Sequence, residues 1–248
     1  AGPAILGEAA FVHHLAIASN GKTSFKIKMN AYFSRMTLVV LLIAVAITCG
    51  LVGGLGNSVD VALIRDGISA RASSPLPTEA GLFLNYAGGV VATIGLGLIA
   101  AILLWRRDQP RLAITIVAIA LVGRLLVEAV KLSVRRARPA LDAHPVTLHS
   151  LSFPSGHAAN SMIVFPLLAL VFAPSGHRVP WVALGVFTSL IIGASRSLIG
   201  VHWPSDVVAG WAIGAAWLIA TWPLAARLVP VESQHDVVGG HRSAVGEV

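Results

Sequence analysis

The sequence predicts an all-α integral membrane protein with six transmembrane helices. Hydrophobic residues make up 56% of the 248 positions and charged residues only 12%, and the mean hydropathy is +0.80. A soluble domain carries about 25% charged residues, so most of this chain is expected to lie in lipid. One helical membrane domain fits the length of the chain.

A membrane-spanning helix needs about 20 mostly apolar residues. Six segments approach that length, and the fourth, which is the shortest, contains Pro166 and is expected to kink there. Trp105, Trp181 and Trp203 are placed at span ends, where an amphipathic ring favours the membrane interface. The predicted spans cover residues 36–56, 82–105, 112–132, 157–172, 181–199 and 207–228.

The glycine pairs Gly50/Gly54 and Gly210/Gly214 have GxxxG spacing, which predicts close packing between helices of this chain. The lone cysteine, Cys49, excludes a disulfide framework.

Three regions follow from this division of the chain. Residues 1–34 form an N-terminal cytoplasmic or interfacial segment, residues 35–229 form the six-helix membrane domain, and residues 230–248 form a polar, disordered C-terminal tail. The first segment lacks the basic start, unbroken apolar core and cleavage site of a signal peptide. It is interpreted as an interfacial amphipathic segment or a loosely ordered tail. Residues 57–81 are expected to form an external loop that covers the functional site.

The distribution of Lys and Arg predicts which side of the membrane the termini occupy. Six spans place both termini on one side, with ten basic residues there against seven on the other. Three of the seven, Lys131, Arg138 and Arg196, belong to the motifs described below and have a separate reason for their position. The remaining ten against four places the termini in the cytoplasm by the positive-inside rule.

Three short motifs carry the chemistry. They are KLSVRRARP at residues 131–139, PSGH at residues 154–157 and SRSLIGVHWPSD at residues 195–206. In this order they read Lys-x6-Arg-Pro, Pro-Ser-Gly-His and Ser-Arg-x5-His-x3-Asp. All three fall at the same end of the predicted bundle, although they are up to about 70 residues apart.

The motifs match the tripartite signature of the type 2 phosphatidic acid phosphatase (PAP2) family at every position, and the chain therefore resembles that family. The resemblance implies a PAP2/haloperoxidase-like helical core and a multi-pass lipid phosphatase of the bacterial inner membrane. Because the count of basic residues places the termini in the cytoplasm, the motifs at the opposite face are expected to face the periplasm. Outside the motifs, the resemblance depends on the number and order of the helices.

Five residues are expected to bind phosphate. Lys131 supplies a point charge, while Arg138 and Arg196 supply planar forks that bind phosphate oxygens in pairs. Ser155 and Gly156 precede an apolar helix whose N-terminal N–H groups favour an anion. Ser155 can donate its hydroxyl or cap the helix, and Gly156 allows close approach of the backbone.

Three further residues are expected to be catalytic. The family resemblance implies that His202 is the nucleophile that forms a phosphohistidine and that His157 is the general acid and base. Pro204 is expected at the first position of the last helix. Asp206 would then lie about one turn beyond His202, near enough to accept the second ring N–H of the nucleophile.

The expected partners are a lipid phosphate substrate and membrane lipids. The motifs contain neither a Cys/His cluster nor a carboxylate-rich site, so no cofactor or catalytic metal is predicted. The net charge of +7 is assigned to helix-flanking residues and an anion site. Nucleic-acid binding is not predicted, because no basic stretch is interleaved with aromatic residues. Protein partners are not indicated.

Four residues outside the signature have two interpretations each. Arg124 and Glu128 share one face of the third span, where they form either a structural ion pair or a group that orients Lys131. Arg135 and Arg136 either attract lipid headgroups or the distal part of a substrate, or are surface charges. His144 and His149 match no signature position and are interpreted as loop residues.

The predicted reaction is removal of a terminal phosphate from a lipid. A polyprenyl diphosphate such as undecaprenyl diphosphate is the first choice of substrate, followed by phosphatidylglycerol phosphate or lipid A 1-phosphate. A lipid phosphotransferase with the same phosphohistidine is an alternative, and so is a non-catalytic lipid-binding or transport protein. Vanadium haloperoxidases share the signature but are soluble. Selectivity is expected to come from residues 57–81, because the loop between Pro139 and Pro154 is short.

Overall fold

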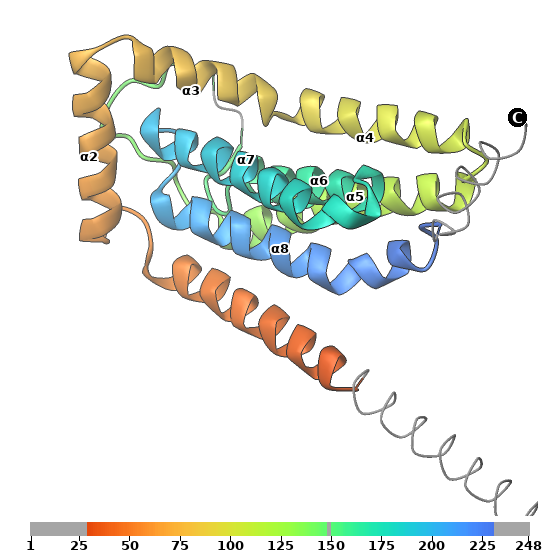
Figure 1. Ribbon diagram of the computed structural model, residues 1–248. Helices are drawn as coiled ribbons and strands as arrows, with labels where there is room; N and C mark the ends of the chain where they lie inside the picture. The colour runs from red at the N-terminus through yellow and green to blue at the C-terminus, as the bar shows by residue number, and fades with distance from the viewer. Residues whose placement is uncertain (1–28, 148–149, 231–248) are drawn as a thin grey trace, which may run out of the picture.

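The computed structural model describes residues 29–147 and 150–230, and these described residues are helical, without strands. The predictions for residues 1–28, for residues 231–248 and for His149 therefore lie outside the described part of the chain. The helices run in the order shown in Figure 1: a first helix Met29–Val52, α2 Ser58–Ser73, α3 Leu76–Ala87, α4 Val90–Trp105, α5 Pro110–Val134, α6 Gly156–Phe172, the 3-10 turn η1 Ser175–His177, α7 Arg178–Leu198 and α8 Pro204–Ala226.

The prediction of six spans is supported in part. Four of the described helices are long and apolar enough to cross a membrane: the first helix, α5, α7 and α8. A fifth crossing exists if α3 and α4, which meet at a bend of 41°, are counted together. The remaining apolar segment, α6, has 17 residues and a length of about 25 Å, slightly less than the hydrocarbon core of a bilayer.

Helix α6 lies at the centre of the bundle. Seven consecutive side chains, from Ala158 to Val164, are buried, because α4, α5, α7 and α8 all contact this helix. The bundle shows these helices running alongside one another (Figure 1). A short helix enclosed by protein on every side does not need to match the bilayer thickness by itself.

The contact between α6 and α8 requires glycine. A Cβ on Gly210 would lie 2.6 Å from the carbonyl oxygen of Ser155 and 2.9 Å from Cβ of Ala158. The corresponding atom on Gly214 would lie 2.6 Å from the carbonyl oxygen of Ala159. The predicted use of this GxxxG pair for packing within the chain is therefore confirmed. The close approach brings the first turn of α8 next to the first turn of α6.

Residues 57–81, predicted to be a loop, are mostly helical. Asn57 caps α2 by accepting hydrogen bonds from the backbone N–H groups of Val59 and Asp60. Figure 1 shows α2 lying across one end of the bundle, where Arg71 donates a hydrogen bond to the carbonyl oxygen of Leu198 at the end of α7. The segment mixes apolar residues with charged residues, Ser and Gly and shows little amphipathic pattern, so neither its hydropathy nor its periodicity indicated a helix.

Candidate active site

Six of the eight predicted site residues line one cavity of about 390 Å³. The cavity lies where α5 ends, α6 begins and α7 turns into α8, so the bundle brings motifs distant in sequence to one place. The two remaining residues, Ser155 and Asp206, are fully buried beside it. The cavity-lining members are Lys131, Arg138, Gly156, His157, Arg196 and His202.

Arg138 fixes the tautomer of His202. Its Nη1 lies 3.1 Å from Nε2 of His202 and also donates to the carbonyl oxygen of Val201 at 2.6 Å. A guanidinium has only donors, so Nε2 must accept with its lone pair and the ring proton must sit on Nδ1. The unprotonated nitrogen therefore faces the guanidinium that is expected to bind phosphate.

Ser152 lies between His202 and Asp206. Its Oγ donates to Oδ2 of Asp206 at 2.5 Å and is 3.5 Å from Nδ1 of His202, whereas Nδ1 and Oδ2 are 3.7 Å apart. The expected direct hydrogen bond from His202 to Asp206 is therefore not formed. The physical reason is that Oδ2 already accepts from the Ser152 hydroxyl and from the backbone N–H of Trp203.

The bond to Trp203 comes from the start of α8. Pro204 opens this helix as predicted, and Asp206 at its third position reaches back to the N–H of the residue that precedes the helix. Trp203, which was expected at the membrane interface, is instead only 3% exposed and donates from its indole to the carbonyl oxygen of Ala137. The helix start thus holds the carboxylate in place.

The environment of His202 favours a neutral ring. The side chain is buried, and burial, followed by the positive charges of Arg138 and Lys131, lowers the pKa of His202 well below its ordinary value near 6.5. A bound anion would offset those charges. The unliganded site therefore presents an uncharged imidazole among cations.

Arg136 is part of the site and is not a surface charge. Its Nη1 is 2.8 Å from Oδ1 of Asp206, and its Nη2 donates to the carbonyl oxygens of Cys49 and Gly50 at 2.8 and 2.7 Å. The guanidinium also lies 4.6 Å from the ring centroid of Phe153. Both interpretations made from the sequence are wrong for this residue, whereas Arg135 is exposed.

The loop before α6 holds Lys131. The ammonium group donates to the carbonyl oxygens of Leu151 and Pro154 at 3.0 and 2.9 Å, and the side chain is 4% exposed. Ser155, which directly precedes α6, makes no capping hydrogen bond through its side chain. Its Oγ is buried and has no partner within the described residues. Of its two predicted uses, donation to a ligand is the one left open.

Asn85 contacts both His157 and Arg196. Its side-chain oxygen accepts from Nη1 of Arg196 at 2.8 Å, and its carbonyl oxygen lies 3.2 Å from Nε2 of His157. In a continuous helix that carbonyl would accept from the N–H of Gly89, but at the α3–α4 bend this N–H bonds to Tyr86 instead. The bend therefore frees a main-chain acceptor for His157.

Arg124 and Glu128 both line the cavity. They form no ion pair with each other in the described part of the chain, so the expected structural pair is not present. Glu128 lies one turn before Lys131, as the alternative interpretation requires. His144, interpreted as a loop residue, hydrogen-bonds through Nε2 to the carbonyl oxygen of Pro139 at 2.7 Å.

The residues expected to determine selectivity, 57–81, do not line the cavity among the described residues. The cavity is lined by Val146, Thr147 and Ser150 of the loop between α5 and α6, and by Asn85, Gly88 and Val90 around the α3–α4 bend. None of its lining residues within the described chain comes from residues 57–81. The short loop contributes because it folds back over the site.

The sequence contained weak signals for the residues that were missed. Asn85 and Asn160 are polar residues inside apolar segments, where a polar group usually faces protein or a cavity. Ser152 and Arg136 lie within a few positions of signature residues. Among the described residues, no three His, Cys, Asp or Glu side chains gather as a metal site would require, and a metal-free reaction stays a prediction.

Residues 111–230, which contain all three motifs, match the family model of the PAP2 superfamily. The predicted resemblance to this family is confirmed. A crystal structure of a transmembrane PAP2-type phosphatidylglycerolphosphate phosphatase from Bacillus subtilis has the same fold, with a TM-score of 0.69 and 23% identity. The match covers 78% of this chain and 96% of that one.

Two curated relatives of the PAP2 region are named as phosphatases. The chain is 30% identical over 124 residues to an undecaprenyl-diphosphatase of Sulfolobus acidocaldarius, covering 48% of this chain and 57% of the relative. It is 33% identical over 130 residues to a lipid A 1-phosphatase of Rhizobium johnstonii, covering 42% and 51%. The matches thus span little more than half the length of these relatives.

Proposed function

We propose that this protein is a membrane lipid phosphatase that works through a phosphohistidine. The single observation that supports this most strongly is the cavity shared by His157, His202 and three cationic signature residues. Lipid phosphatases among the relatives agree with the proposal. A polyprenyl diphosphate is the proposed first substrate, with phosphatidylglycerol phosphate and lipid A 1-phosphate as the next candidates.

The proposed reaction has two steps. Nε2 of His202 attacks the terminal phosphorus, the bond from phosphorus to the leaving oxygen breaks, and His157 gives that oxygen a proton. His157 then removes a proton from water, which attacks the phosphohistidine and releases inorganic phosphate. The positive charge that develops on the His202 ring is stabilised by Ser152, whose Oγ faces Nδ1–H, and by the carboxylate of Asp206 behind it.

Binding of the phosphoryl group is assigned to the remaining signature residues. Lys131, Arg138 and Arg196 neutralise its charge, and the buried hydroxyl of Ser155 donates to one oxygen. The N–H groups at the start of α6, at Gly156, complete the anion site. The charge count along the sequence favours an arrangement in which this end of the bundle faces the periplasm and the termini face the cytoplasm.

Phosphate release by the purified, detergent-solubilised protein in excess chelator tests the proposal. Undecaprenyl diphosphate, phosphatidylglycerol phosphate and lipid A are assayed in parallel. Release is expected to persist under chelation and to be lost in His202→Ala, while His144→Ala, a control outside the cavity, keeps its activity. A folded wild-type protein that releases phosphate from none of these lipids would reject the proposed function.

A further inference from the structure

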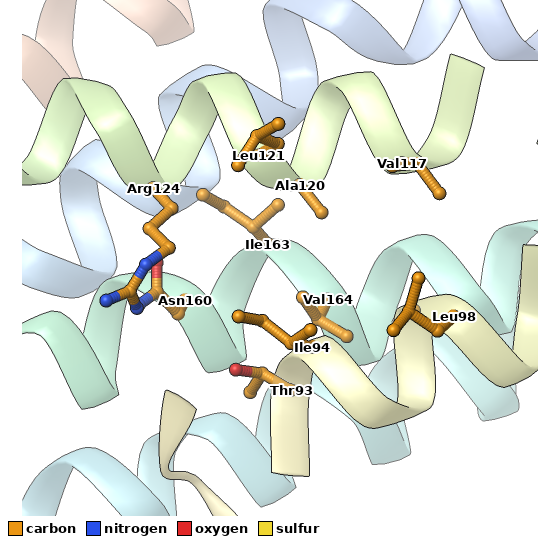
Figure 2. Close-up of a pocket in the computed structure, with 11 residues that line it drawn as sticks. Thr93, Ile94, Leu98, Val117, Ala120, Leu121, Arg124, Asn160, Ile163 and Val164 are labelled. Atoms are coloured by element: carbon orange, nitrogen blue, oxygen red, sulfur yellow. The ribbon is translucent and has the colours of Figure 1, made fainter. Parts of the chain in front are cut away.

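A second, apolar cavity adjoins the candidate active site. It has a volume of about 230 Å³ and lies between α4, α5 and α6, with aliphatic side chains such as Ile94, Leu121 and Ile163 on its walls. Arg124 and Asn160 line this apolar cavity, called the groove below, and also line the polar cavity that His202 lines. Figure 2 shows these two polar residues at one end of the groove and Leu98 and Val117 at the other.

The two shared residues have unused hydrogen-bonding capacity. Within the described chain Arg124 makes no hydrogen bond or ion pair, although Glu128 is one turn away. Asn160 is only 7% exposed, and its Oδ1 has no hydrogen-bond partner in the same part of the chain. A buried polar group without a partner is costly, which indicates that a ligand supplies one.

The other cations of the polar cavity are already bonded to the protein. Lys131 donates to two carbonyl oxygens, Arg138 to Ser150 and Val201, and Arg196 to Asn85. Among the described residues, four cationic side chains and one carboxylate, that of Glu128, line the cavity. Four cations are more than one phosphoryl group requires. The fourth, Arg124, is the one that also lines the groove.

We propose that Arg124 and Asn160 bind the inner phosphate of a diphosphate lipid, between the reacting phosphate at His202 and the hydrocarbon chain in the groove. The inference rests on the proposed function and narrows its substrate class. In a ligand that extends from the site into the groove, the group bonded directly to the hydrocarbon chain lies beside Arg124 and Asn160. In a prenyl diphosphate that group is an anion, whereas in a prenyl monophosphate the chain begins there.

The arrangement predicts a preference that Arg124 controls. The guanidinium donates to the two non-bridging oxygens of the inner phosphate, and the Asn160 amide donates its NH₂ to one of the same oxygens, since its oxygen and nitrogen can exchange places. Removal of the charge should therefore weaken the use of the diphosphate and leave the monophosphate almost unaffected.

The test compares farnesyl diphosphate with farnesyl monophosphate, which share one hydrocarbon chain. In Arg124→Gln, kcat/KM for the diphosphate is expected to fall about tenfold or more, with less than about a threefold change for the monophosphate. Arg124→Lys is expected to lose less, because it keeps the charge. Asn160→Asp, which places an anion in the subsite, should show the same selective loss, and Arg111→Gln at the far end of α5 is the matched control.

The outcomes separate this inference from the function on which it rests. A parallel fall for both substrates, or an unchanged ratio of their kcat/KM values in folded Arg124→Gln and Asn160→Asp, overturns the subsite while the phosphatase stands. If Arg124→Gln does not fold, the ratios in Arg124→Lys and Asn160→Asp decide. No phosphate release by the wild-type protein from either substrate or from the longer lipids overturns both.

Discussion

Arg136 and Asp206 form a buried ion pair, with Nη1 2.8 Å from Oδ1, that links the end of the first helix to the candidate active site. The arginine side chain is 10% exposed and the aspartate side chain is fully enclosed. Since the same guanidinium binds the carbonyl oxygens of Cys49 and Gly50, the carboxylate is anchored to a helix outside the signature.

Arg136→Ala is expected to destabilise the protein and reduce turnover together. Removal of one partner leaves a buried carboxylate without its counter-charge, and the free energy of unfolding should fall by about 3 kcal/mol. Thermal unfolding in detergent measures this, with Arg135→Gln as the neighbouring, exposed control. Equal unfolding temperatures for the two variants would show that the pair contributes nothing to stability.

Ser152→Ala should lower kcat roughly tenfold with little change in KM, because it removes the hydroxyl between Nδ1 of His202 and Oδ2 of Asp206. Ser161→Ala is the matched control: this hydroxyl is equally buried but bonds only to the carbonyl oxygen of Ala158 in its own helix. The role assigned to Ser152 fails if both variants retain wild-type kcat.

Asp206→Asn should reduce kcat and leave substrate affinity nearly intact. The amide cannot balance the positive charge that develops on His202, whereas the phosphate-binding cations remain. Single-turnover kinetics together with binding of a non-hydrolysable lipid phosphonate separate the two effects. An equal loss of binding and turnover would instead assign Asp206 a structural role.

The His202 ring is expected to stay neutral at pH 6.5 in the unliganded protein, because burial and the nearby cations lower its pKa. The unfolded chain binds this proton more readily, so the stability that His202 contributes is present above about pH 6.5 and is lost as the pH falls below it. Histidine ¹⁵N NMR, with the His202→Gln spectrum for assignment, reports the ring state. A ring that is half protonated near pH 6.5 would contradict the expectation.

Gly210→Ala should destabilise the bundle by about 1–3 kcal/mol, because its new methyl group would lie 2.6 Å from the carbonyl oxygen of Ser155. Gly95→Ala is the control, since nothing lies within 4 Å of a Cβ at that position in α4. It should be neutral or slightly stabilising, as alanine is the better helix former. Similar thermal unfolding of the two variants would count against the close helix contact.

The parts of the structure that depend on local sequence were predictable. Long apolar runs located helices α5 to α8 to within three residues, whereas the span predicted at residues 82–105 is divided between α3 and α4. The fixed spacing of the motifs identified the residues around the cavity. Helix α2 was missed because its apolar and polar residues are mixed with little helical periodicity. The contacts of Ser152, Arg136 and Asn85 were missed because their partners lie 54 to 111 positions away and no local pattern encodes them.

The bend between α3 and α4 has a consequence for mutagenesis. The acceptor that it offers to His157 is a peptide carbonyl, which every amino-acid replacement at position 85 retains. An alanine scan would report only the loss of the side-chain bond to Arg196 and would leave the other contact undetected. Replacing the peptide bond after residue 85 by an ester, through incorporation of a hydroxy acid at position 86, weakens this carbonyl acceptor and also removes the N–H of residue 86. This chemical substitution therefore reaches a contribution to the site that conventional genetics cannot address.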